Sequence, residues 1–180
     1  YRALDRNDSS HLALRFTILT LARSASIRGA RFEEIDGDIW TIPKERMKGT
    51  VTSAAAFRIP LSNAALEVVS RAEEWRRSSY LFPGARSGGI SDVAVAKVLR
   101  KVAPGCAPHG MRTSFRTWVQ DTDAASYDVA ETALAHIIGG KVERAYARSD
   151  LLDRRRVLME SWADFVTGAD AKVVSIRGER

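Results

Sequence analysis

The chain has 180 residues, 45% of them hydrophobic and 28% charged, a composition typical of a folded domain and not of a disordered segment. No apolar run approaches the roughly 18 residues that a membrane-spanning helix requires, and the single cysteine, Cys106, excludes an internal disulfide and a cysteine-rich zinc site. The formal net charge of +6 favours a polyanionic partner, because basic side chains that neutralise phosphates release bound counterions. We expect a cytoplasmic protein without membrane contact.

The first sixty residues predict two helices and then a pair of strands. Apolar residues recur at helical spacing over 9–23, where Ser9 or Ser10 is the expected N-cap. A second, short helix is expected over 24–30. Two short segments rich in apolar and β-branched or aromatic residues are expected to pair as antiparallel strands: 38–43 and 57–61.

The rest of the chain predicts mainly helices. They are expected over 62–77, 91–102, 110–120, 128–137, 142–147 and 151–166. Val69 and Phe165 are among the side chains expected to face the core. The predicted fold class is mainly α with one small antiparallel sheet (α+β). We expect one domain over residues 1–180, with its core at about 9–167 and a frayed tail from 168 to 180.

The sequence lacks the short motifs of several common enzymes. A phosphate-binding Gly-x-x-x-x-Gly-Lys-Ser/Thr loop, a Gly-x-Gly-x-x-Gly fingerprint and a His-Glu-x-x-His metal motif are all absent. The histidines are too scattered to indicate a metal site, and we expect neither a metal nor a cofactor. His109 and Arg112, three residues apart, would share one face of a helix and could reach one phosphate. Taken alone, such a pair is more often a capping histidine and a surface arginine.

Six short motifs nevertheless follow one another along the chain. They are Leu-Thr-Leu-Ala-Arg ending at Arg23, Glu-Arg-Met-Lys ending at Lys48, Leu-Phe-Pro at 81–83, His-Gly-Met-Arg at 109–112, Leu-Ala-His ending at His136, and Glu-Arg-Ala-Tyr ending at Tyr146. Each motif is weak by itself. Their order and rough spacing resemble the active-site signature of the tyrosine recombinases, above all of the integrases of prophages and genomic islands. The resemblance covers about residues 9–167.

The resemblance implies the catalytic-domain fold of the DNA breaking-rejoining enzymes and a substrate of double-stranded DNA at attachment sites. It implies that Arg23 and Arg112 hold the non-bridging oxygens of one phosphodiester with fork-shaped donors. Tyr146 would attack phosphorus to give a 3′-phosphotyrosine, so that DNA is cut and rejoined without metal or ATP.

Three further residues receive roles from the same resemblance. His109 is expected to take the phenol proton, Lys48 to protonate the leaving 5′-oxygen, and His136 to hydrogen-bond the phosphate. One position departs from the family pattern, because Ser26 occupies the place of an acidic residue that braces the active site. Its loss puts full activity in doubt.

The resemblance also implies partners and leaves two rival functions open. Such integrases assemble as homotetramers on DNA, whereas this chain alone could be a monomer. The sequence begins at Tyr1 and not at a methionine, so we expect upstream DNA-binding domains to be missing and the whole protein to act in the cytoplasm at the bacterial nucleoid. One rival is a type IB topoisomerase, which uses the same phosphotyrosine chemistry. The other is a DNA-binding regulator that has lost cleavage, a reading that Ser26 keeps open.

Overall fold

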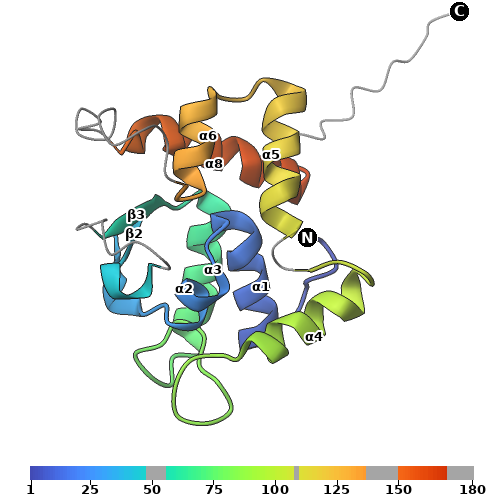
Figure 1. The fold of residues 1–180 in the computed structure, drawn as a ribbon. Coiled ribbons are helices and arrows are strands. Elements are labelled where there is room, and N and C mark those ends of the chain that lie inside the picture. Colours follow the sequence, from blue (N-terminus) through green and yellow to red (C-terminus); the bar gives the residue numbers. More distant parts are fainter. Residues whose placement is uncertain (48–55, 108–109, 137–149, 170–180) are drawn as a thin grey trace, which may run out of the picture.

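The computed structural model describes residues 1–47, 56–107, 110–136 and 150–169. Within these ranges the α-helices are α1 (Ser9–Thr20), α2 (Ser24–Arg28), α3 (Asn63–Glu74), α4 (Asp92–Val102), α5 (Gly110–Thr122), α6 (Tyr127–Ala133) and α8 (Leu152–Thr167). The strands are β1 (Ile35–Asp36), β2 (Ile39–Ile42) and β3 (Phe57–Pro60), and two 3₁₀ turns are η1 (Phe32–Glu34) and η2 (Lys44–Arg46). Figure 1 shows α1 to α4 and the sheet in one half of the molecule and α5, α6 and α8 in the other. The predicted α+β class is confirmed.

Helix α1 lies at the centre of the first half, where it contacts α2, α3, α4 and α8. Its N-cap is Asp8 and neither of the predicted serines, because the Asp8 carboxylate accepts hydrogen bonds from the backbone N–H groups of Ser10 and His11, both at 3.1 Å. The helix ends at Thr20, three residues earlier than predicted, because Leu21 adopts a left-handed conformation with φ 56°. The residues that follow are therefore extended and leave the helix axis.

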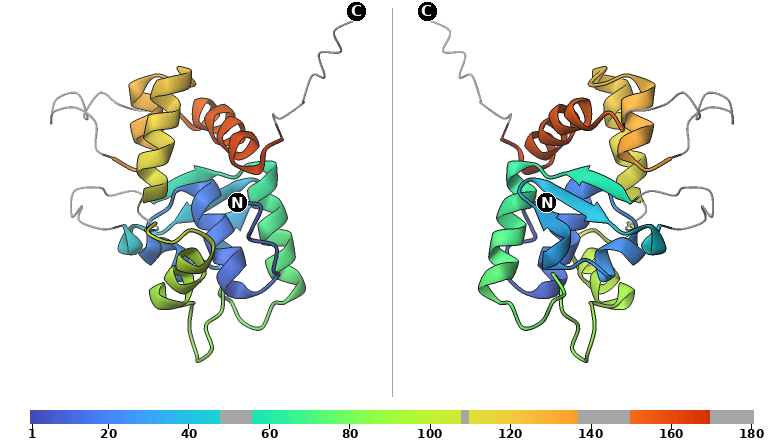
Figure 2. Two further views of the ribbon diagram at one scale, coloured as in Figure 1. Left: turned by 90° about the vertical axis from the view of Figure 1, so that its right-hand side faces the viewer. Right: turned by 90° about the vertical axis from the view of Figure 1, so that its left-hand side faces the viewer.

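The three strands form an antiparallel sheet in the order β1-β2-β3. Trp40 pairs with Ile59 in the β2–β3 register, and both side chains are buried, so this pair lies on the face of the sheet that meets the core. Strand β1 was not predicted. Figure 2 shows β3 running beneath α8, which it contacts.

Two clusters of buried apolar side chains fill the two halves. The first joins α1, the sheet, α3 and α4, with the Phe16 and Trp40 ring centroids 5.1 Å apart. The second joins α5, α6 and α8 around an edge-on contact of Phe115 with Trp162, whose centroids are 5.4 Å apart. Leu21 belongs to the second cluster although it directly follows α1. The chain after α1 thus lies at the junction of the two cores.

Several predicted details differ from the structure. Helix α6 ends at Ala133, not at 137, so His136 follows the helix. Val69 is partly buried against the core as predicted, although its neighbour Val68 is buried more completely. Phe165, predicted to face the core, is 53% exposed, with its ring stacked on Trp118. The helix predicted over 142–147 lies outside the described residues. No helix in the described ranges is both long and apolar enough to cross a lipid bilayer.

Arg155 joins α8 to the sheet. It is 1% exposed and donates hydrogen bonds at 2.7 Å to two carbonyl oxygens, those of Asp150 and Arg58. Its guanidinium carbon also lies 5.1 Å from the centre of the Phe57 ring. Burial lowers the pKa of Arg155 to about 10, against the opposing effect of the Asp150 carboxylate, so the side chain stays charged at neutral pH.

Arg155→Ala is expected to lower the free energy of unfolding by about 3 kcal/mol, because two carbonyls each lose a charged donor worth about 1.5 kcal/mol. Urea unfolding monitored by tryptophan fluorescence measures the change. Arg154→Ala on the exposed face of the same helix is the control, expected to stay within about 0.5 kcal/mol of the unchanged chain. Equal stability of the two variants would contradict an anchoring role for Arg155.

Candidate active site

Arg23 lies in the extended segment between α1 and α2. It is the N-cap residue of α2, with φ −70° and ψ 149°, and its side chain is half-buried. Its guanidinium Nη2 donates to the backbone oxygen of Ala135 at 3.4 Å. Among the described residues Arg23 forms no ion pair, so its positive charge is uncompensated by a carboxylate.

Arg112, in the first turn of α5, is 7% exposed and reaches the same place. Its guanidinium donates to the backbone oxygens of Leu21, just after α1, and Leu134, just after α6. Its Nη2 also lies 3.0 Å from His136 Nε2. Burial, and after it the nearby charge of Arg23, lower the pKa of Arg112 to about 10. At neutral pH two guanidinium charges therefore stand close together.

His136 is held between a carboxylate and a guanidinium. Its Nδ1 lies 2.7 Å from Glu131 Oε2, and an ionised carboxylate can only accept, so Nδ1 carries a proton. Arg112 can only donate, so in the neutral ring Nε2 is the acceptor of its N–H. This pairing fixes both the orientation and the tautomer of the ring.

Glu131 connects the cluster to a third arginine. It is 6% exposed, and its second oxygen, Oε1, accepts from Arg116 Nε at 2.9 Å. Arg116 lies one turn after Arg112 on α5 and keeps 45% of its side chain exposed. The cluster therefore contains three guanidiniums and a single carboxylate, a strongly positive site at the surface that suits an anion such as a phosphate group.

Comparison with known proteins gives a consistent result. The chain is 32% identical over 170 residues to the protein named Prophage integrase IntA of Escherichia coli K12, a match that covers 91% of this chain and 40% of that protein. It is 33% identical over 177 residues to Prophage integrase IntZ of the same strain, covering 92% of this chain and 42% of the relative. The integrase of Enterobacteria phage P4 is 29% identical over 185 residues, with 93% and 42% covered.

The chain is related to the phage and prophage integrases. It spans about two fifths of the length of the curated relatives that it matches. No family model matches the sequence. No solved structure matches it either.

In this integrase relative the structure brings together three of the six predicted site residues: Arg23, Arg112 and His136. The other three, Lys48, His109 and Tyr146, lie outside the described residues. Met47, the last described residue before the gap at 48–55, lines the same small hollow as Arg23 and Arg112. In the described ranges no group of three or more metal-binding side chains is present.

Glu131 and Arg116 were not predicted as site residues. A glutamate at the start of Glu-Thr-Ala-Leu-Ala-His is expected on the exposed face of a helix, as is an arginine four residues after Arg112. Only their spacing could have indicated the Glu131–His136 contact. Glu131 lies five residues before His136, and the two can meet because α6 ends between them.

Ser26, which stands where an acidic residue was expected, is 2% exposed and lines the same hollow as Arg23. Its hydroxyl brings no charge to the site. A carboxylate does lie close by, because Glu34 pairs with Arg46, and Arg46 Nη1 donates to the Ser26 backbone oxygen at 3.5 Å. The Glu34 carboxylate binds Arg46 and accepts from the Trp40 indole N–H at 3.0 Å. It therefore holds the start of the β2–β3 connection in place.

Proposed function

We propose that this chain is the catalytic part of a tyrosine-type site-specific recombinase, with the catalytic-domain fold of that family, which cuts and rejoins double-stranded DNA during integration. The observation that carries the proposal is the meeting of Arg23, Arg112 and His136. Arg112 donates hydrogen bonds to Leu21, 91 positions before it, and to Leu134, 22 positions after it. Because residues from such distant segments meet here, the arrangement supports an anion-binding site formed by the fold and not an arginine that lies there by chance.

The chemistry follows from the charges. A DNA phosphodiester is an anion, and the five-coordinate transition state of its cleavage carries additional negative charge on the non-bridging oxygens. Fixed guanidiniums at Arg23 and Arg112 would offset that charge without reorganising during the reaction. Arg112 has five N–H donors, of which three meet Leu21, Leu134 and His136, so two remain for a phosphate.

The covalent step is assigned to the three residues outside the described ranges. The Tyr146 oxygen would bond to phosphorus while the bond from phosphorus to the 5′-oxygen breaks. His109 would accept the phenol proton and Lys48 would supply a proton to the 5′-oxygen. The phosphotyrosine keeps the energy of the broken bond, so attack by another 5′-hydroxyl reverses the step on the same or a new strand.

Whether His136 can hydrogen-bond the phosphate depends on which of its ring nitrogens carry a proton. With Nδ1 protonated by its contact with Glu131, a neutral ring presents only a lone pair at Nε2 and cannot donate to a phosphate. Donation requires a proton on Nε2 as well as on Nδ1. We therefore infer that His136 donates to the phosphate only when both of its ring nitrogens carry a proton.

The proposal extends to the whole protein. Attachment-site DNA would be the partner, a homotetramer on two DNA sites the working assembly, and the bacterial nucleoid in the cytoplasm its location. The 180-residue chain would act as one catalytic domain whose DNA-binding domains lie upstream. These features rest on the kinship with integrases and on the positive cluster.

A pool of nicked duplexes with a randomised central sequence tests the proposal without knowledge of the attachment site. Cleavage beside a nick releases a short 5′-hydroxyl strand that diffuses away, so an active enzyme remains covalently attached to the DNA. We expect a denaturant-resistant adduct whose sequenced DNA has a common motif. Binding to DNA with no adduct at any protein concentration would reject the enzyme in favour of a DNA-binding regulator, and supercoil relaxation without sequence preference would favour a topoisomerase.

Glu131→Gln is expected to slow single-turnover cleavage by about 10- to 100-fold, because a hydrogen bond to a charged group is worth about 1.5–3 kcal/mol. The amide can also present its NH₂ to Nδ1 and move the ring proton to Nε2, where it faces Arg112. Asp128→Asn, the same chemical change at an exposed position of α6, is the control and is expected to leave the rate unchanged. Equal rates for both variants would remove Glu131 from the site.

A further inference from the structure

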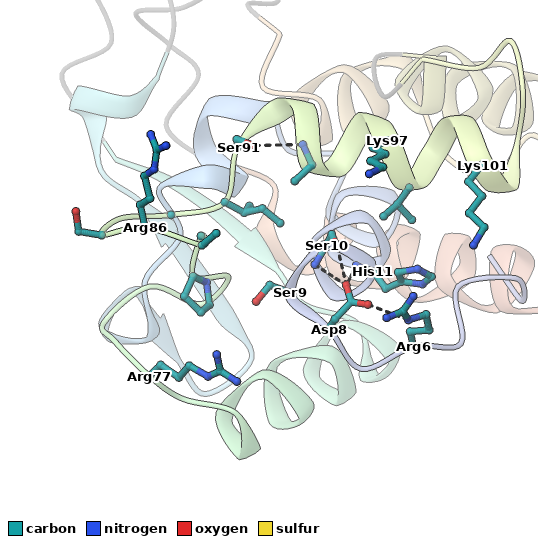
Figure 3. Close-up of a pocket in the computed structure, with 18 residues that line it drawn as sticks. Arg6, Asp8, Ser9, Ser10, His11, Arg77, Arg86, Ser91, Lys97 and Lys101 are labelled. Atoms are coloured by element: carbon teal, nitrogen blue, oxygen red, sulfur yellow. Dashed lines mark hydrogen bonds and ion pairs between the residues drawn. The ribbon is translucent and has the colours of Figure 1, made fainter.

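A second positively charged site lies at the other end of α1. There the segment before α1, the first turn of α1, the loop between α3 and α4, and one side of α4 enclose an open groove of about 860 Å³. Figure 3 shows Lys97 and Lys101 projecting from the side of α4 that faces the first turn of α1, with Arg6 and His11 opposite them. Arg77 and Arg86 come from the connecting loops and line the same groove.

The charges in the groove are unbalanced. One carboxylate, that of Asp8, lines it, and this group is already used as the cap of α1 and as the partner of Arg6 at 3.1 Å. Arg77, Arg86, Lys97 and Lys101 make no ion pair among the described residues. Four uncompensated cations around one open groove are expected to attract a polyanion.

A buried polar atom points to the same conclusion. His11 is 8% exposed, yet its Nδ1 has no hydrogen-bond partner in the described part of the chain. A buried polar nitrogen without a partner costs about 1–3 kcal/mol, and native structures contain few of them. His11 lines the groove, and a turn of its covered ring toward the groove would let Nδ1 meet a phosphate oxygen there. Neither the cap nor the packing of α1 explains this atom.

We propose that this groove binds phosphates of the DNA backbone beside the segment held at the Arg23–Arg112 cluster, an inference that rests on the proposed function. Helix α1 begins at the groove and ends three residues before Arg23, and its 12 residues span about 18 Å. That length equals roughly five nucleotide steps of about 3.4 Å along one strand. A duplex that is positioned for cleavage and runs along α1 would bring flanking phosphates within reach of Lys97 and Lys101. A small metabolite would not need cations spread over such an open surface.

The double variant Lys97→Gln/Lys101→Gln tests the groove by non-specific binding to a 30-base-pair duplex over a range of salt concentrations. Each lost phosphate contact reduces the slope of log K against log salt by about 0.9, so we expect a slope smaller by about 1.8. Arg100→Gln/Arg154→Gln is the matched control, because it removes the same charge from exposed positions outside the groove. The control is expected to change the slope by much less.

A slope equal to that of the unchanged chain, or equal slopes for the two double variants, would overturn the proposal and leave the groove to a different ligand. The result is independent of cleavage. If the unchanged chain forms no covalent adduct, the proposed enzyme fails while the salt slope still decides the groove. If adducts form, the groove variant is expected to reach the same final yield at saturating protein and to need more protein to do so.

Discussion

Tyr146→Phe is expected to form no covalent adduct with nicked DNA, while its affinity for DNA stays within about twofold of the unchanged chain. The substitution removes one oxygen atom, the proposed nucleophile, and leaves an aromatic ring of nearly the same size. A phenol has an ordinary pKa near 10 and is a weak nucleophile unless a base or positive potential acts on it. The cluster of Arg23, Arg112 and Arg116 would provide such a potential if Tyr146 approaches it.

The environments of the other three tyrosines support this assignment by elimination. Burial raises the pKa of Tyr1, which makes its phenolate harder to form. Tyr80 is held by Arg31, whose Nη2 donates to the phenol oxygen at 3.3 Å while the guanidinium carbon lies 4.5 Å from the ring centre. Tyr127 is 65% exposed at the first residue of α6, the end of that helix opposite His136.

Tyr127→Phe is the matched control and is expected to form adducts at the normal rate. Both variants are incubated with the randomised nicked pool, and the adduct is measured on denaturing gels. A normal adduct yield from Tyr146→Phe would contradict the assignment, and mass spectrometry of the cross-linked peptide would then identify the true nucleophile.

Most of the fold could be predicted because periodicity is a local property of the sequence. The predicted helices after residue 60 that lie in the described ranges, and the β2–β3 pair, carry strong apolar patterns, and the structure has them within a few residues of the predicted bounds. The end of α1 could not be predicted in this way. Leu21 is a leucine in a left-handed conformation, a state that its residue type disfavours, and only its burial in the second core accounts for it.

In the candidate site, too, some residues could be predicted from local sequence and others could not. Arg112 and His136 belong to motifs with a recognisable order, so the sequence was sufficient to single them out. Glu131 has no such signal, because its importance depends on α6 ending at Ala133 and on the chain turning back to place His136 beside it. The end of α6 and the turn after it depend on the burial of Ala133 and Leu134 in the second core, which no local pattern records.

Arg112→Ala is expected to slow single-turnover cleavage by about 10²- to 10³-fold, the usual effect of removing one donor that stabilises a developing negative charge. The same change leaves the carbonyl oxygens of Leu21 and Leu134 without their charged donor, which should lower the free energy of unfolding by about 3 kcal/mol. The two effects must be separated, because an unfolded protein also fails to cleave.

Arg112→Lys separates them. Lysine keeps a positive charge near Arg23, but an ammonium group cannot bridge two carbonyls and a histidine with the planar fork of a guanidinium. Cleavage rates are first corrected for the folded fraction measured by urea unfolding. If the guanidinium geometry matters, the corrected rate of Arg112→Lys is at least tenfold lower than that of the unchanged chain. A corrected rate equal to that of the unchanged chain would mean that Arg112 supplies charge alone. A near-normal corrected rate for Arg112→Ala would remove it from the reaction and reduce its contacts with Leu21 and Leu134 to a structural role.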